Sequence, residues 1–160
     1  MKTIILMTAM LLAVAFADSA VAGTELNIRG YIAAYETYEL DGDILKIDGT
    51  GTASLNGLGA CTVTYHFDLN IITGSAPGSH QFTWTNGDSL STTSLGQGIL
   101  TDLDPGETIN YVAEIHTIAG GTGRFAHVSG NFLLERMVGF PLDSGATSGW
   151  FNGHISKSAP

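Results

Sequence analysis

The stretch Ala119-Gly120-Gly121-Thr122-Gly123-Arg124-Phe125-Ala126 joins two segments in which apolar and polar residues alternate, residues 109–118 and 125–136. Glycines fill three of four consecutive positions in it: Gly120, Gly121 and Gly123. Glycine allows positive φ angles and a close approach of backbones, and a tight connection between twisted strands needs both. The stretch therefore predicts a hairpin between two strands.

The same alternation, with a period of two residues, runs along most of the chain and is interrupted by turn pairs such as Asp41-Gly42, Asn56-Gly57 and Asn86-Gly87. Loops are expected at Gly74–Gly78, which contains Pro77, and through Pro141 to Gly145. The predicted strands cover residues 26–38, 44–54, 60–72, 81–85, 89–100, 109–118, 125–136 and 149–156. No helical period follows residue 22, so the predicted fold is all-β, a single closed antiparallel up-and-down barrel of about eight strands. Closure removes the exposed strand edges.

Alternation also predicts which side chains face the interior of the barrel. In residues 109–118 the apolar side chains are expected inside: Ile109, Tyr111, Ala113 and Ile115. Asn110, Glu114 and His116 are then expected on the outer face. The residues expected to line the lumen, and to bind a ligand there, are Val63, Tyr65, Phe67, Tyr111, Ala113, Phe132 and Leu134.

The first residues have the pattern of a cleaved export signal, with Lys2, an apolar run from Ile4 to Ala17 and the cleavage triplet Ala20-Val21-Ala22. We expect a signal peptide over residues 1–22 and one barrel domain over residues 23–160, secreted or periplasmic, with no membrane span after cleavage. The net charge of −9 disfavours nucleic acid as a partner. A homo-oligomer is a further possibility.

Gly120 to Phe125, set between two strands, resembles the signature of allene oxide cyclase-like barrels, a group that also resembles the plant dirigent proteins and includes small secreted bacterial members. Allene oxide cyclases guide the ring closure of an apolar epoxide, and dirigent proteins steer the coupling of phenol radicals. The resemblance implies a lumen that positions an apolar molecule, and it identifies no catalytic side chain here.

Three motifs that suggest other chemistry have simpler structural interpretations. The glycine-rich stretch lacks the lysine and the following helix of a phosphate-binding loop. Gly87-Asp88-Ser89-Leu90 spells a hydrolase motif, but the chain has no Asp-x-x-His, and a hairpin turn explains these residues better. Cys61 is the only cysteine, has no neighbouring base in sequence, and is expected to be a buried, unreactive thiol.

The histidines show no spacing that would place two metal ligands on one strand or helix face, so neither a metal nor a cofactor is expected, although a site assembled across strands stays open. Two pairs, Glu114 with His116 and His66 with Asp68, share strand faces and could act as acid and base, but surface polarity is the favoured interpretation. Trp84 and Trp150 could stack on a sugar ring, but barrel packing is the favoured interpretation.

These observations favour a binding or interaction module, because the expected lumen holds tyrosines and Cys61 but no acid, base or cation. A cyclase-like or dirigent-like enzyme acting on an apolar substrate is the alternative.

Overall fold

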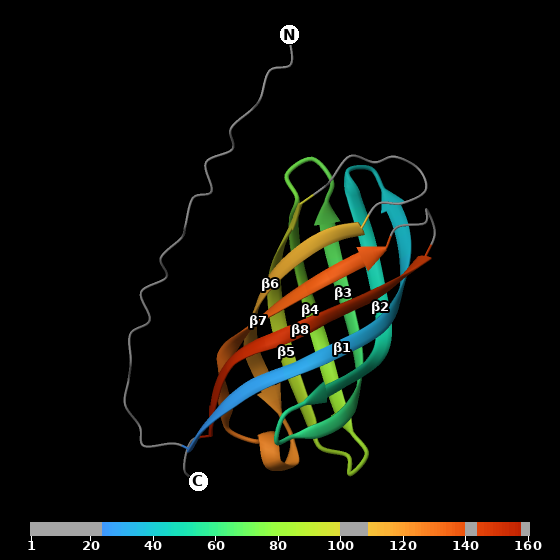
Figure 1. Cartoon of the computed structure of the whole chain (residues 1–160). Coiled ribbons are helices and arrows are strands. Elements are labelled where there is room, and N and C mark those ends of the chain that lie inside the picture. Colours follow the sequence, from blue (N-terminus) through green and yellow to red (C-terminus); the bar gives the residue numbers. More distant parts are fainter. Residues whose placement is uncertain (1–23, 100–108, 140–143, 158–160) are drawn as a thin grey trace.

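In the computed structural model, which describes residues 24–99, 109–139 and 144–157, eight antiparallel strands close into one barrel, each paired with its sequence neighbours and the last with the first. Figure 1 shows the strands winding obliquely around a common axis. The strands are β1 (Thr24–Asp41), β2 (Ile44–Leu55), β3 (Gly59–Asn70), β4 (Ser75–Trp84), β5 (Ser89–Ile99), β6 (Ile109–Gly121), β7 (Val128–Gly139) and β8 (Ser144–Lys157). The predicted closed all-β barrel is confirmed. The signal-peptide prediction lies outside the described residues.

The strands end at turns that their glycines favour. Gly42, Gly57 and Gly87 have φ angles of 62°, 74° and 87° in the β1–β2, β2–β3 and β4–β5 connections. Ordinary side chains rarely adopt such angles. The predicted turns at these positions are confirmed, and the alternation between them brings one face of each strand into the core.

Three strands, β4, β7 and β8, begin at other residues than predicted. β4 begins at Ser75 and includes Pro77, in a stretch expected to be a loop. The β3–β4 ladder ends at the Phe67–Gly78 pair, so Pro77 has a partner strand on one side only, where a proline is tolerated. β7 begins at Val128, and Ser144 and Gly145, expected in a loop, belong to β8.

The glycine-rich stretch forms the connection between β6 and β7, with a short 3-10 turn, η1 (Gly123–Phe125). Gly123 has a φ of 58°, in agreement with the expected need for glycine. The Phe125 side chain is buried at this end of the barrel, against Trp84 at a ring-centroid distance of 4.3 Å. We refer to this end, at the bottom of Figure 1, as the η1 end.

Gly123→Val is expected to lower the free energy of unfolding by about 1–3 kcal/mol, because a β-branched residue is strained at positive φ. A Cβ atom at position 123 would also lie 1.7 Å from the Asp88 Oδ1 atom. Urea unfolding midpoints measure the loss. The control Ser89→Ala, which removes only a hydroxyl contact with Thr122, should stay close to the parent. Equal midpoints for Gly123→Val and the parent would contradict the turn argument.

Candidate functional site

The barrel interior changes from apolar to polar along its axis. From the η1 end inward, the core is mostly apolar and contains a group of three aromatic rings, Phe82, Phe132 and Phe151, whose centroids lie 5.6–6.3 Å apart. Beyond these rings six polar side chains meet, which we call the polar cluster: Glu36 of β1, Tyr65 of β3, His80 of β4, Glu114 and His116 of β6, and Arg136 of β7. All six are at most 5 % exposed.

Strand alternation explains how these residues reach the interior. Arg136 follows the inward residues Phe132 and Leu134 at steps of two along β7, and His80 precedes Phe82 in the same way along β4. Glu36 continues the inward face of β1 that starts with Ile28 and Ile32. Arg136, His80 and Glu36 therefore lie on strand faces that also carry core residues.

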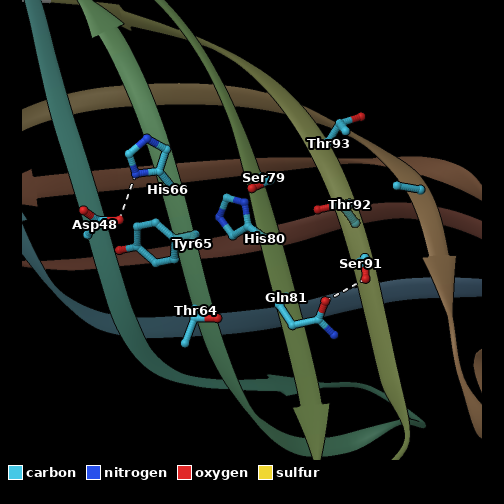
Figure 2. A pocket seen from close by; sticks show the side chains of 11 residues that line it. Asp48, Thr64, Tyr65, His66, Ser79, His80, Gln81, Ser91, Thr92 and Thr93 are labelled. Carbon is cyan, nitrogen blue, oxygen red and sulfur yellow. Dashed lines mark hydrogen bonds and ion pairs between the residues drawn. The ribbon is translucent and has the colours of Figure 1, made fainter.

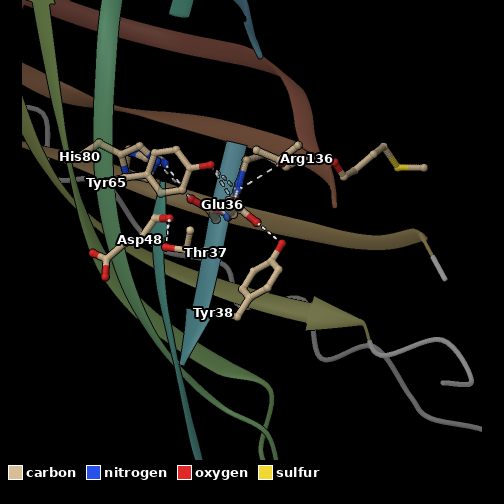
Figure 3. Close-up of polar contacts among 11 residues, drawn as sticks. Glu36, Thr37, Tyr38, Asp48, Tyr65, His80 and Arg136 are labelled. Atoms are coloured by element: carbon tan, nitrogen blue, oxygen red, sulfur yellow. Dashed lines mark hydrogen bonds and ion pairs between the residues drawn. The ribbon is translucent and has the colours of Figure 1, made fainter. Parts of the chain in front are cut away.

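Arg136 lies at the centre of the polar cluster (Figure 3). Its Nε and Nη2 atoms lie 2.6 and 2.5 Å from Oε1 of Glu114, and Nη1 donates to Oε1 of Glu36. The guanidinium carbon also lies 5.1 Å from the centroid of the Tyr65 ring. Burial alone would lower the pKa of Arg136, but the two carboxylates outweigh it and raise that pKa. The guanidinium therefore stays charged.

Glu36 accepts two further hydrogen bonds from tyrosines. The Tyr65 hydroxyl donates to Oε1 at 2.7 Å, and the Tyr38 hydroxyl donates to Oε2 at 2.9 Å. Burial and the neighbouring Glu36 carboxylate raise the pKa of both phenols, so both remain neutral donors. Tyr38 is only half-buried and lies near the last residue of β1, which ends opposite the η1 end (Figure 1), so it connects Glu36 with that rim of the barrel.

The two histidines form the other side of the cluster. His116 lies 3.0 Å from the Thr92 hydroxyl through Nδ1 and 3.2 Å from Oε2 of Glu114 through Nε2, and its ring stacks on Phe132. His80 lies with its Nε2 atom 3.9 Å from the same Glu114 oxygen. Neither ring nitrogen of His80 has a hydrogen-bond partner among the described residues. Burial, followed by His116 and Arg136, lowers the pKa of His80 well below its usual value, so the ring is neutral.

The structure brings five of the seven expected lumen residues together in the core: Val63, Tyr65, Phe67, Phe132 and Leu134. The expectation for β6 was wrong. Glu114 and His116 are fully buried, whereas Ile115 is 57 % exposed. Tyr111 and Ala113 share the face of Ile115 and are half-buried, and the Tyr111 hydroxyl donates to Glu135.

The reversal on β6 has a physical cause. Alternation within residues 109–118 predicts that Glu114 faces water, and a lone buried carboxylate would indeed be very unfavourable. Arg136 supplies the counter-charge of Glu114 from β7, the strand that pairs with β6. The pairing that makes burial of Glu114 tolerable is therefore between strands, and alternation within β6 alone does not reveal it.

Sequence reasoning missed three members of the cluster, Glu36, His80 and Arg136. His80 was missed because Pro77 suggested a loop up to residue 78. For Arg136 a signal was present, since the steps of two from Phe132 through Leu134 lead to it. A charged residue on an otherwise apolar strand face indicates a buried charge. Glu36, on the face of Ile28 and Ile32, is a second example.

The other candidate residues lie outside the cluster. His66 is exposed on the outer face of β3, and a hydrogen bond to Asp48 raises its pKa. This pair borders a depression of about 480 Å³ over β2–β5, which the Ser91–Gln81 hydrogen bond also borders (Figure 2). Burial raises the pKa of the Cys61 thiol to about 11, which agrees with the expectation of an unreactive thiol.

Ser89, Trp84 and Trp150 also lie outside the polar cluster. Ser89 begins β5, directly after the β4–β5 turn, and its hydroxyl contacts Thr122. Trp84 packs in the core, while Trp150 is exposed on β8 beside Tyr31.

No protein-family model matches the chain, and no curated protein or solved structure matches it. Among residues 24–99, 109–139 and 144–157 there is no helix with the length and apolar character needed to span a membrane.

Proposed function

We propose that the protein binds a small molecule inside its barrel, beside the polar cluster. The observation that carries this proposal is the burial of two carboxylates, one guanidinium and two imidazoles within an apolar barrel. Apolar residues of similar volume would stabilise such a core as well or better than a buried ion pair does. His80 adds a buried ring whose two nitrogens have no hydrogen-bond partner among the described residues, and such groups call for a further partner.

The surroundings indicate the chemistry of this molecule. Phe82, Phe132 and Phe151 offer apolar surface on one side, and the polar cluster offers hydrogen bonds on the other. The two carboxylates of the cluster outnumber its one guanidinium, and this excess of negative charge disfavours an anion. We therefore infer a small, mainly apolar and uncharged molecule with one hydroxyl or carbonyl group. Tyr38 marks the rim from which it enters.

A neutral solvatochromic dye tests this proposal. Ser94 faces inward on β5, opposite His116 in the β5–β6 ladder, and its hydroxyl has no partner among the described residues. Ser94→Phe places a large ring beside the cluster, where the proposed molecule would lie, and should abolish dye binding. Ala113→Phe introduces the same ring on the outer face of β6 and serves as the matched control, which should bind as the parent does.

Urea unfolding establishes that both variants are folded, and native mass spectrometry of the parent purified from its own host detects a retained molecule independently. A parent that binds no dye and retains no molecule would overturn the proposal. Equal dye affinity in folded Ser94→Phe and the parent would place binding outside the barrel.

A cyclase-like or dirigent-like enzyme is the second candidate. The buried Glu114–His116 pair, with Tyr65 and Arg136 nearby, supplies the acid, base and cation that the expected lumen lacked. The glycine-rich signature and the closed barrel support the same relationship. Incubation of the parent with the molecule recovered from it should then produce a rearranged product, and Glu114→Gln should slow that conversion. Recovery of an unchanged molecule would favour binding alone.

We also propose that the barrel acts after export, in the periplasm or the medium. Lys2, the apolar run to Ala17 and the triplet ending at Ala22 support this. Intact mass of the exported protein should show an N-terminus at Gly23, and retention of Met1 would overturn the localisation.

A further inference from the structure

We propose that His80, Glu114 and His116 form a binding site for a divalent transition-metal ion such as Zn²⁺. One ligand atom from each lies within 4.8 Å of the others, and all three side chains are buried. No second group of three histidine, cysteine or acidic residues comes as close in the part of the chain that the structure describes.

The distances suit a metal with little adjustment. Bonds of about 2.0–2.1 Å to a tetrahedral zinc ion place its ligand atoms about 3.3–3.4 Å apart. Oε2 of Glu114 lies 3.2 Å from Nε2 of His116 and 3.9 Å from Nε2 of His80. Of these two distances only the one to His80 exceeds that spacing, so the His80 ring is the ligand that has to move toward Glu114.

Neighbouring groups hold two of the three ligands in the orientation that a metal requires. The Thr92 hydroxyl lies 3.0 Å from Nδ1 of His116, so when Nδ1 carries the proton and donates it to Thr92, Nε2 is free to bind the ion. Arg136 holds Oε1 of Glu114 and leaves Oε2 directed toward both histidines. Such outer partners are typical of metal sites and set which ligand atom is presented.

The surroundings of His80 support a bound ligand independently of these distances. Its ring is 2 % exposed, stacks on Tyr65 at 4.8 Å and lies 4.4 Å from the His116 ring, and yet neither nitrogen has a hydrogen-bond partner among the described residues. A neutral imidazole buried beside a carboxylate and a second imidazole has the chemistry of a metal ligand. A bound ion would supply the missing partner.

The charges of the cluster also suit a cation. The carboxylates of Glu36 and Glu114 and the guanidinium of Arg136 together carry one net negative charge. A divalent cation at the site would change this net charge from −1 to +1. Two imidazoles and one carboxylate are a common donor set for zinc and other first-row divalent ions, and three protein ligands leave a further position for water or a small oxygen ligand. The spacing rule applied to the sequence did not detect the site because its ligands come from two strands.

Metal titration of chelator-treated full-length protein tests the site. Co²⁺ reports coordination geometry through its visible absorption, and calorimetry with Zn²⁺ gives stoichiometry and affinity. We expect one ion per chain. His80→Phe and His116→Phe keep aromatic rings in the stacked positions but remove the nitrogens, and each should weaken binding by more than a hundredfold. Thr92→Val should weaken it by roughly ten- to a hundredfold, as changes next to a ligand do.

His66→Phe is the matched control, because His66 has Asp48 and Asp68 as neighbours on the outer surface and could bind metal weakly there. It should leave the Co²⁺ spectrum unchanged, and thermal unfolding without metal shows that all variants are folded. Absence of binding by the parent, or binding lost in His66→Phe and kept in His80→Phe, would overturn the site. This inference does not rest on the proposed small molecule, since dye binding and metal binding are measured separately.

Discussion

Substitution of Arg136 by methionine is expected to lower the free energy of unfolding by about 3–5 kcal/mol, because it leaves two buried carboxylates without a counter-charge. Glu36 and Glu114 are both fully buried, and both accept from this one guanidinium. Methionine fills a similar volume, so the loss reports the missing charge rather than a cavity. Urea unfolding at neutral pH, with intrinsic fluorescence as the signal, measures it.

Arg124→Met is the matched control for this prediction. Arg124 is exposed at the η1 end, where it lies 3.3 Å from an Asp88 oxygen, and loss of a surface ion pair costs about 0–1 kcal/mol. A triple variant with Glu36→Leu, Glu114→Leu and Arg136→Met should regain most of the lost stability, because it removes all three charges together. An Arg136→Met protein as stable as Arg124→Met would show that the buried charges are not coupled in this way.

Phe82→Ala is expected to cost about 3–5 kcal/mol, as truncation of a fully buried aromatic ring does. Phe82 has no exposed surface and contacts the rings of Phe132, Phe151 and His80 in the middle of the barrel. Phe132 and Phe151 belong to β7 and β8, and His80 lies on β4 itself. The closed sheet fixes all three positions, so these rings cannot move together to fill the space. The denaturant midpoint, compared at constant slope, measures the change.

The control for Phe82→Ala is Trp150→Ala, a larger truncation on the outer face of β8, where the ring is 57 % exposed. It should cost clearly less, since the Trp150 ring is largely exposed and its contact with Tyr31 is at a ring-centroid distance of 6.4 Å. A smaller loss for Phe82→Ala than for Trp150→Ala would contradict the description of the three rings as the centre of the core.

The fold could be predicted from the sequence because its signals are local. The alternation from Cys61 to Leu69 places five side chains in the core, as expected. The positive φ angles of Gly87 and Gly123 lie at turns that short motifs had indicated. The prediction failed where pairing between distant strands decides the structure. Pro77 was expected in a loop, but β4 tolerates it because the ladder with β3 has already ended on one side.

The polar cluster could be predicted only in part, because polarity was used to decide which face is outside. That rule works for His66 and Asp68, which are exposed on β3. It fails for Glu114, since the charge that compensates it belongs to Arg136, 22 residues further along the chain. A buried network is stabilised by partners from separate strands, and no window of a single strand contains both partners.

The pairing of β1 with β8 has a consequence for how the chain can fold. This ladder joins residues near both ends of the described chain, such as Leu26 with Ile155, so the barrel closes only through its longest-range contacts. Until β8 is available, β1 and β7 each present an unpaired edge that can associate with other chains. The last fourteen-residue strand therefore protects the nascent molecule from aggregation as well as completing its core.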